Sequence, residues 1–190
     1  MSSALIIQFL GELDRIKKMS GSLNEQTIRP AFRNMLRSWA ISEGLFLLEE
    51  HEFETKLKTK VYPDGTIVHD LRVPLGYWEA KDTKDDLDAE IADKVSKGYP
   101  TSNIIFENSE LAVLYQHGSE VVRAPMQDAD ALSRLLTLFF KYERPEIADF
   151  RKAVEQFKTD LPAVLDALRN KIESAYAENE DFKESADDFL

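Results

Sequence analysis

The sequence predicts an α/β (α+β) fold in which a mixed β-sheet is flanked by helices. Apolar residues recur at helical spacing near both ends of the chain, while β-rich runs and turn signals occupy its middle. A helix-prone segment separates the β-rich runs. With 190 residues, 43% of them hydrophobic, the chain is long enough to bury one sizeable core.

The N-terminal part is predicted to form two helices. Apolar residues at helical spacing between positions 5 and 16 predict a first helix that ends near Met19. Asn24 is a suitable N-cap for a second helix, which Gly44 would end. The apolar run at 45–48 either extends this helix or begins a strand.

The middle of the chain is predicted to form the sheet. The turn signal at 62–65 separates strand-like segments at 53–61 and 66–73, which predicts a hairpin. A third strand is expected at 77–81. A helix is then expected at 85–97, stopped by Gly98. Further β-rich runs lie at 103–106, 111–115 and 121–122.

The last third returns to helical periodicity. Pro145 is expected to end one helix, and Pro162 to lie in the first turn of the next, where its missing N–H is not needed. We therefore expect a domain at 1–172 with a helical C-terminal extension. Residues 173–190 would form an acidic tail or a linker to a following domain that this chain does not contain.

Composition excludes several functions and at first disfavours another. The chain has no cysteine, so it has neither a thiol nucleophile nor disulfides. No apolar run approaches the roughly 20 residues of a membrane span, so we expect a cytoplasmic protein. A net charge of −11 disfavours nucleic-acid binding. However, residues 173–190 alone contribute −6 of it, from seven acidic side chains and one lysine.

One group of residues could form a metal-binding catalytic site. If Asp70 and Glu79 lie on neighbouring strands, their carboxylates can converge on an oxygen-rich site for Mg²⁺ or Mn²⁺, to which the Ala80 carbonyl adds a further oxygen. Lys81 lies two residues beyond Glu79, so both side chains point to the same face of a strand. A lysine beside such a metal can stabilise charge on a phosphate.

Glu-x-Lys by itself is a weak signal, because ordinary surface charges produce it often. The chain contains another copy at 54–56 and similar triplets at 82–84 and 181–183. Glu79 differs from these because it follows an aromatic strand and has an upstream aspartate on a candidate partner strand.

The pattern Asp70…Glu79-Ala80-Lys81 resembles the catalytic motif of the PD-(D/E)xK nuclease superfamily. More narrowly, the chain resembles the N-terminal nuclease domain of single-polypeptide, Type ISP-like restriction–modification enzymes. The sequence segments that show this resemblance lie at 27–32, 76–82, 98–100, 103–108 and 150–154.

The resemblance implies a Mg²⁺-dependent endonuclease domain with a restriction-endonuclease-like core that cleaves double-stranded DNA. Asp70 and Glu79 would bind the metal, and Lys81 would be catalytic. Glu25 would complete the metal site, or else it is simply a favourable charge at a helix N-terminus. Helicase-like, methyltransferase and target-recognition domains would follow in the same polypeptide. Whether two nuclease domains pair to cut both strands is left open.

The chain departs from the family pattern at one point. Motor-coupled relatives often carry Gln four residues before Tyr on the helix after the motif, but here Val95 precedes Tyr99 at that distance. Lys94 and Lys97 would then contact the DNA backbone beside Tyr99, or they are solvated helix charges. The alternative functions are a catalytically silent nuclease-like docking module and a binding domain whose motif is coincidental.

Overall fold

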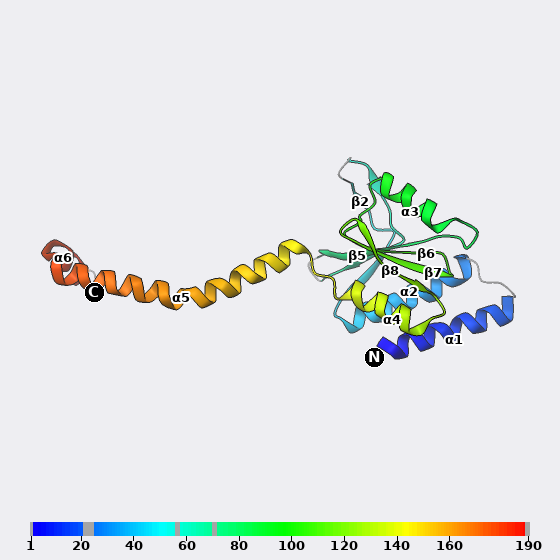
Figure 1. Ribbon diagram of the computed structural model, residues 1–190, viewed down its shortest axis with the longest axis horizontal. Helices are drawn as coiled ribbons and strands as arrows, with labels where there is room; N and C mark the ends of the chain where they lie inside the picture. Colours follow the sequence, from blue (N-terminus) through cyan, green and yellow to red (C-terminus); the bar gives the residue numbers. More distant parts are fainter. Residues whose placement is uncertain (1, 21–24, 56–57, 70–71, 189–190) are drawn as a thin grey trace. The chain divides into compact units, whose positions relative to one another are not determined.

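The structure is a computed structural model that describes residues 2–20, 25–55, 58–69 and 72–188. The chain divides into two compact units, Met1–Tyr142 and Glu143–Leu190 (Figure 1). The boundary expected at 172–173 falls within the second unit, inside a helix. Among the described helices, none is both long and apolar enough to span a membrane.

The first unit contains a sheet and its covering helices. In chain order its elements are α1 (Ser2–Ser20), α2 (Glu25–Ser42), β1 (Phe46–Glu49), β2 (Phe53–Glu54), β3 (Lys60–Val61), β4 (Gly65–Val68), β5 (Pro74–Ala80), α3 (Leu87–Ser96), β6 (Asn103–Glu107), β7 (Leu111–Gln116), β8 (Ser119–Pro125) and α4 (Ala129–Phe140). The run at 45–48 therefore forms a strand and does not extend the second helix.

The main sheet has six strands in the order β1-β4-β5-β6-β7-β8. Neighbours are antiparallel except β5 and β6, which are parallel. A parallel pair needs a crossover connection, and α3 supplies it. The predicted class, a mixed sheet flanked by helices, is confirmed.

Alternating residues of β5 divide between two hydrophobic clusters. Trp78 and Ala80 belong to the cluster that α1, α2 and α4 cover, whereas Tyr77 packs with Leu87 and Ile91 of α3. The ribbon shows α3 apart from the helices that cover the other face (Figure 1). This alternation decides which side chains of β5 face α3.

The predicted hairpin between 53–61 and 66–73 is wrong. The second strand ends at Val68, and it pairs with β1 and β5. The segment at 53–61 instead contributes β2 and β3, which pair with each other in a small separate sheet. All four residues of β4 are buried, so this strand needs a neighbour at each edge, and the apolar β1 meets that need better than a polar segment.

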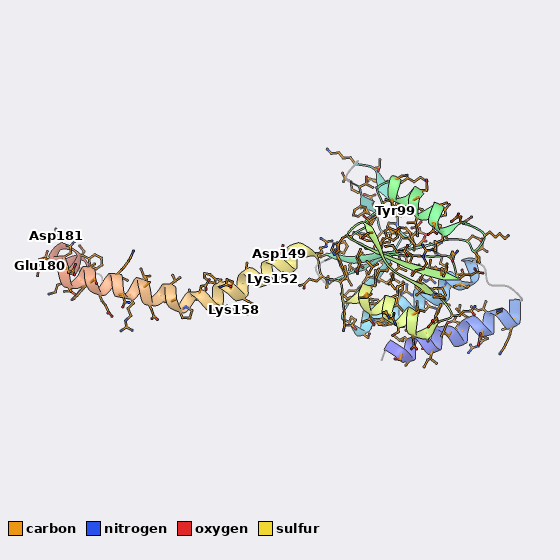
Figure 2. All side chains as sticks on the ribbon, in the orientation of Figure 1. Tyr99, Asp149, Lys152, Lys158, Glu180 and Asp181 are labelled. Atoms are coloured by element: carbon orange, nitrogen blue, oxygen red, sulfur yellow. The ribbon has the colours of Figure 1, made fainter. Side chains whose placement is uncertain are left out.

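The second unit contains α5 (Pro145–Glu178) and α6 (Glu180–Asp187). Pro145 begins α5, in the position where a proline N–H is dispensable. The expectation that Pro162 begins a new helix is wrong, because α5 continues through it. Asp149, Lys152 and Lys158 project from α5 as charged side chains (Figure 2). The Tyr176 hydroxyl donates to Asp187 Oδ1 at 2.7 Å and so links α5 to α6.

Gly76 of β5 offers a test of the packing under α4. A Cβ at Gly76 would lie 2.6 Å from Asn103 Nδ2 and 2.6 Å from the Phe139 ring. The Asn103 amide cannot move freely, because it donates to Leu75 O at 3.1 Å and to Phe139 O at 3.0 Å.

Gly76→Ala is therefore expected to lower the free energy of unfolding by about 1–3 kcal/mol, as overpacking does. Gly11→Ala is the matched control, because Gly11 is exposed in α1 and a Cβ there meets nothing within 4 Å. We expect it to stabilise the protein by up to about 1 kcal/mol through helix propensity. Urea denaturation measures both, and equal effects would contradict the packing described here.

Candidate active site

The β5 strand carries Glu79 and Lys81 to the face of the sheet that α3 covers. The Glu79 side chain is buried, with 5% of it exposed, and the Lys81 side chain is 15% exposed. Lys81 Nζ lies 3.3 Å from Glu79 Oε1, which confirms that the two side chains share a face. The Lys81 N–H donates to Glu107 O of β6 at 2.7 Å, so strand-like hydrogen bonding continues past the end of β5.

Asp64 stands beside Glu79 at the start of β4. The register pairs Gly65 with Trp78. Asp64, which precedes Gly65, therefore lies level with Glu79, which follows Trp78. Asp64 Oδ2 accepts a hydrogen bond from the Ala80 N–H at 2.7 Å. Arg29 of α2 forms an ion pair with Asp64 Oδ1. The Asp64 side chain is 16% exposed and is held from two sides.

Glu79 lies in surroundings that oppose its negative charge. Burial raises the pKa of the Glu79 carboxyl, and the nearby Asp64 carboxylate raises it further. Lys94 and Lys81 act in the opposite direction but do not cancel this rise. Both lysines contact Oε1, whereas the buried Oε2 has no hydrogen-bond partner among the described residues. Glu79 Oε2 is therefore an acceptor that the described residues leave unused.

Lys94 reaches Glu79 from α3. Its ammonium forms an ion pair with Glu79 Oε1 and donates to the Tyr99 hydroxyl at 3.0 Å. It also lies 4.4 Å from the centre of the Tyr99 ring. Burial alone lowers the pKa of Lys94, but the hydrogen bonds to Glu79 and Tyr99 outweigh burial and raise it. The Lys94 side chain is only 16% exposed.

The end of α3 explains why Tyr99 folds back onto Lys94. Gly98 has a φ of +83°, and its N–H donates to Val95 O at 3.0 Å. The Tyr99 N–H donates to Lys94 O at 3.1 Å. These two bonds form a Schellman motif, which needs a residue that adopts the left-handed conformation without strain. Gly98 thus stops the helix and also sets the position of Tyr99, which is labelled in Figure 2.

A second acidic side chain of α3 contacts Lys81. Glu90 Oε2 lies 3.3 Å from Lys81 Nζ, and the Glu90 side chain is 35% exposed. The Lys81 ammonium is therefore bracketed by one buried and one partly exposed carboxylate. The orientation of the Lys81 side chain is therefore fixed by Glu90 of α3 as well as by Glu79 of β5.

The predicted site residues fall into three groups. The structure brings five of them together, namely Glu79, Ala80, Lys81, Lys94 and Tyr99. Lys97 lies apart from this group, because it pairs with Asp93 and its side chain is 60% exposed. Asp70 and the side chain of Glu25 lie outside the described residues.

Asp64 is a site residue that the sequence reasoning missed. Its segment, 62–65, has the composition of a turn, and the sequence alone predicts only a turn there. A signal was present nonetheless, since Pro63-Asp64 directly precedes a strand and the Glu-x-Lys strand follows it. The sequence already makes these two strands candidate partners, but only their register, with Gly65 opposite Trp78, brings Asp64 level with Glu79.

The chemistry of the donors suits a hard divalent cation. Asp64 and Glu79 supply carboxylate oxygens, and Glu79 Oε2 is a buried acceptor that no described residue contacts by a hydrogen bond. The Ala80 N–H points toward Asp64, and in an extended strand the carbonyl of the same residue points to the same edge. Within the described part of the chain, no group of three or more His, Cys, Asp or Glu side chains could hold a metal. The fit therefore depends on two carboxylates and a backbone oxygen.

The chain is similar to a solved structure of a protein–DNA complex. No protein-family model matches the chain, and no curated protein matches it. A chain in the "cryoEM structure DrdV-DNA complex" matches with a TM-score of 0.80 and 44% sequence identity. The match covers 93% of this chain but 17% of that one. It agrees with a PD-(D/E)xK restriction-endonuclease-like core and extends over nearly the whole chain.

Proposed function

We propose that this chain is a metal-dependent endonuclease domain that hydrolyses phosphodiester bonds of double-stranded DNA. The observation that carries the proposal is the buried Glu79, whose Oε2 has no partner in the described part of the chain while Asp64 and Lys81 stand beside it. Burying a carboxylate with an unpartnered oxygen is costly, and a bound cation would offset that cost. The structural likeness to a chain from a DNA complex supports DNA as the substrate.

The residues that would hold the metal are Asp64, Glu79 and the Ala80 carbonyl. Mg²⁺ and Mn²⁺ both prefer such oxygen ligands. A bound divalent cation would polarise a phosphate oxygen and lower the pKa of a coordinated water. Arg29 pairs with Asp64 Oδ1 and the Ala80 N–H donates to Oδ2, so a metal would share these oxygens through their remaining lone pairs.

Lys81 would act on the reacting phosphate. Its ammonium lies on the same face as Glu79 and is held between Glu79 and Glu90. A fixed positive charge there can orient a water or stabilise the negative charge that develops on the phosphate. Because Lys81 follows the metal-binding Glu79 by two residues, one strand would position both functions.

We further propose that the domain is the cutting part of a larger restriction–modification enzyme of the Type ISP-like kind. The chain spans about one sixth of the neighbour that it matches, which leaves room there for other domains. Those domains would supply sequence recognition and much of the affinity for DNA, since this chain carries a net charge of −11. A cytoplasmic location is in keeping with this role.

Nicking of supercoiled plasmid by the 190-residue chain tests the proposed function. We expect conversion to open-circular DNA with Mg²⁺ or Mn²⁺ and none with excess EDTA. Heat-denatured protein serves as the control for contaminating activity. If the chain binds metal and DNA without nicking, the catalytically silent docking module is the better description.

A further inference from the structure

Lys94 of α3 borders the candidate metal site, where it contacts Oε1 of Glu79. Lys94 and Lys81 share one oxygen of Glu79, and 16% or less of each of these three side chains is exposed. The pair between Lys94 and Glu79 is thus largely shielded from water, which strengthens it. Lys94 faces into the site and does not extend along the surface of α3.

The positive and negative charges of this cluster are equal in number among the described residues. Among the described residues, three carboxylates and three cationic groups are linked by the contacts given above, and they are Asp64, Glu79, Glu90, Arg29, Lys81 and Lys94. A divalent cation is drawn to a site by its negative charge. Among the described residues that charge is compensated by side chains, so a metal must enter against the nearby ammonium groups.

Lys94 differs from Lys81 in how it is held. Lys81 divides its contacts between Glu79 and Glu90, whereas Lys94 contacts Glu79 and Tyr99. Tyr99 accepts a hydrogen bond from Lys94 and also presents its ring to the ammonium. The Schellman motif at Gly98 fixes Tyr99 in this place. The fold therefore holds the Lys94 ammonium in a fixed position beside Glu79.

We propose that Lys94 is a positioning residue that serves as an internal counter-cation. It neutralises Glu79 in the metal-free protein and competes with the divalent cation, and in this way it lowers the metal affinity of the site. The inference rests on the proposed function, because it assumes that Glu79 is a metal ligand. A direct DNA contact is the competing role, and measurements made without DNA separate the two.

The experiment measures Mn²⁺ binding to the full 190-residue chain in the absence of DNA, by the loss of the free-ion electron paramagnetic resonance signal. Lys94→Gln removes the charge but keeps an N–H donor for Glu79. Lys97→Gln is the matched control, because Lys97 lies on the same helix and pairs with Asp93 at 2.5 Å outside the cluster. Lys94→Arg restores the charge, and Glu79→Gln removes the ligand.

We expect Lys94→Gln to bind Mn²⁺ at least about tenfold more tightly than the parent chain. Lys97→Gln should bind as the parent does, and Lys94→Arg should return toward parental affinity. Thermal unfolding supplies an independent measurement. Metal-free Lys94→Gln should melt at a lower temperature, because Glu79 has lost one of its two charged partners. The melting temperature of this variant should rise more than the parent's on adding Mn²⁺.

Two negative results have different meanings. If the parent binds Mn²⁺ through Glu79 but Lys94→Gln binds no more tightly, the inference on Lys94 is overturned and the proposed function stands. If no variant binds Mn²⁺, or if Glu79→Gln leaves binding unchanged, the proposed metal site has failed and the inference fails with it. Should Lys94→Gln not fold, Lys94→Met replaces it, since its unbranched side chain matches the apolar stem of lysine.

Discussion

Replacing Asp64 by asparagine is expected to reduce metal-dependent nicking at least about a thousandfold, equivalent to roughly 4 kcal/mol of transition-state stabilisation. Asparagine keeps an oxygen acceptor for the Ala80 N–H, which Asp64 Oδ2 accepts at 2.7 Å, so β4 and β5 should stay in register. It removes the negative charge that a divalent cation needs. Initial nicking rates at saturating Mg²⁺ give the comparison, and circular dichroism checks the fold.

The same experiment decides which aspartate is needed, together with Glu79, for metal-dependent nicking. Asp70→Asn is measured in parallel because the sequence motif predicts a role for Asp70, while Asp85→Asn controls for the loss of one surface carboxylate. Loss of activity in Asp64→Asn alone would support the pairing across β4 and β5. Full activity in Asp64→Asn together with loss in Asp70→Asn would reverse the assignment.

Lys81→Met is expected to reduce nicking to a similar extent, again about a thousandfold, but for a different reason. Methionine fills the space of the apolar stem and removes the ammonium that lies 3.3 Å from both Glu79 Oε1 and Glu90 Oε2. The charge that stabilises the reacting phosphate is lost, whereas the metal ligands remain. Single-turnover cleavage with Mg²⁺ measures the chemical step.

Mn²⁺ binding distinguishes this variant from a ligand variant. Lys81→Met should still bind Mn²⁺, because it removes a cation and no oxygen donor. Lys84→Met is the control for charge, since Lys84 is exposed in the loop that follows β5. Nicking by Lys81→Met at the parental rate would remove Lys81 from the proposed mechanism.

The fold class and half of the candidate site follow from local pattern. The alternation of a strand places Glu79 and Lys81 on one face whatever surrounds them, and their 3.3 Å separation agrees with this. The helix at α3 was also predictable, because Asp86 caps its start and Gly98 ends it. These features depend on neighbours within a few positions of the chain.

The other half of the site depends on strand pairing. Asp64 lies 15 residues before Glu79 in sequence but opposite it in space, because β4 pairs antiparallel with β5. The turn signal at 62–65 places Asp64 outside the predicted strands, so local pattern identifies it only as a turn residue. The position of β4 between β1 and β5 determines which residues lie beside Glu79. No local sequence pattern predicts that strand order.

By itself, the sequence determined the layered α/β class, the shared face of Glu79 and Lys81, and the chemistry that such residues permit. The tertiary structure alone decided which carboxylate stands beside Glu79 and that Lys94 turns inward to compensate its charge. The physical reason is that periodicity acts over a few residues, whereas strand order, register and charge compensation arise from contacts between distant segments.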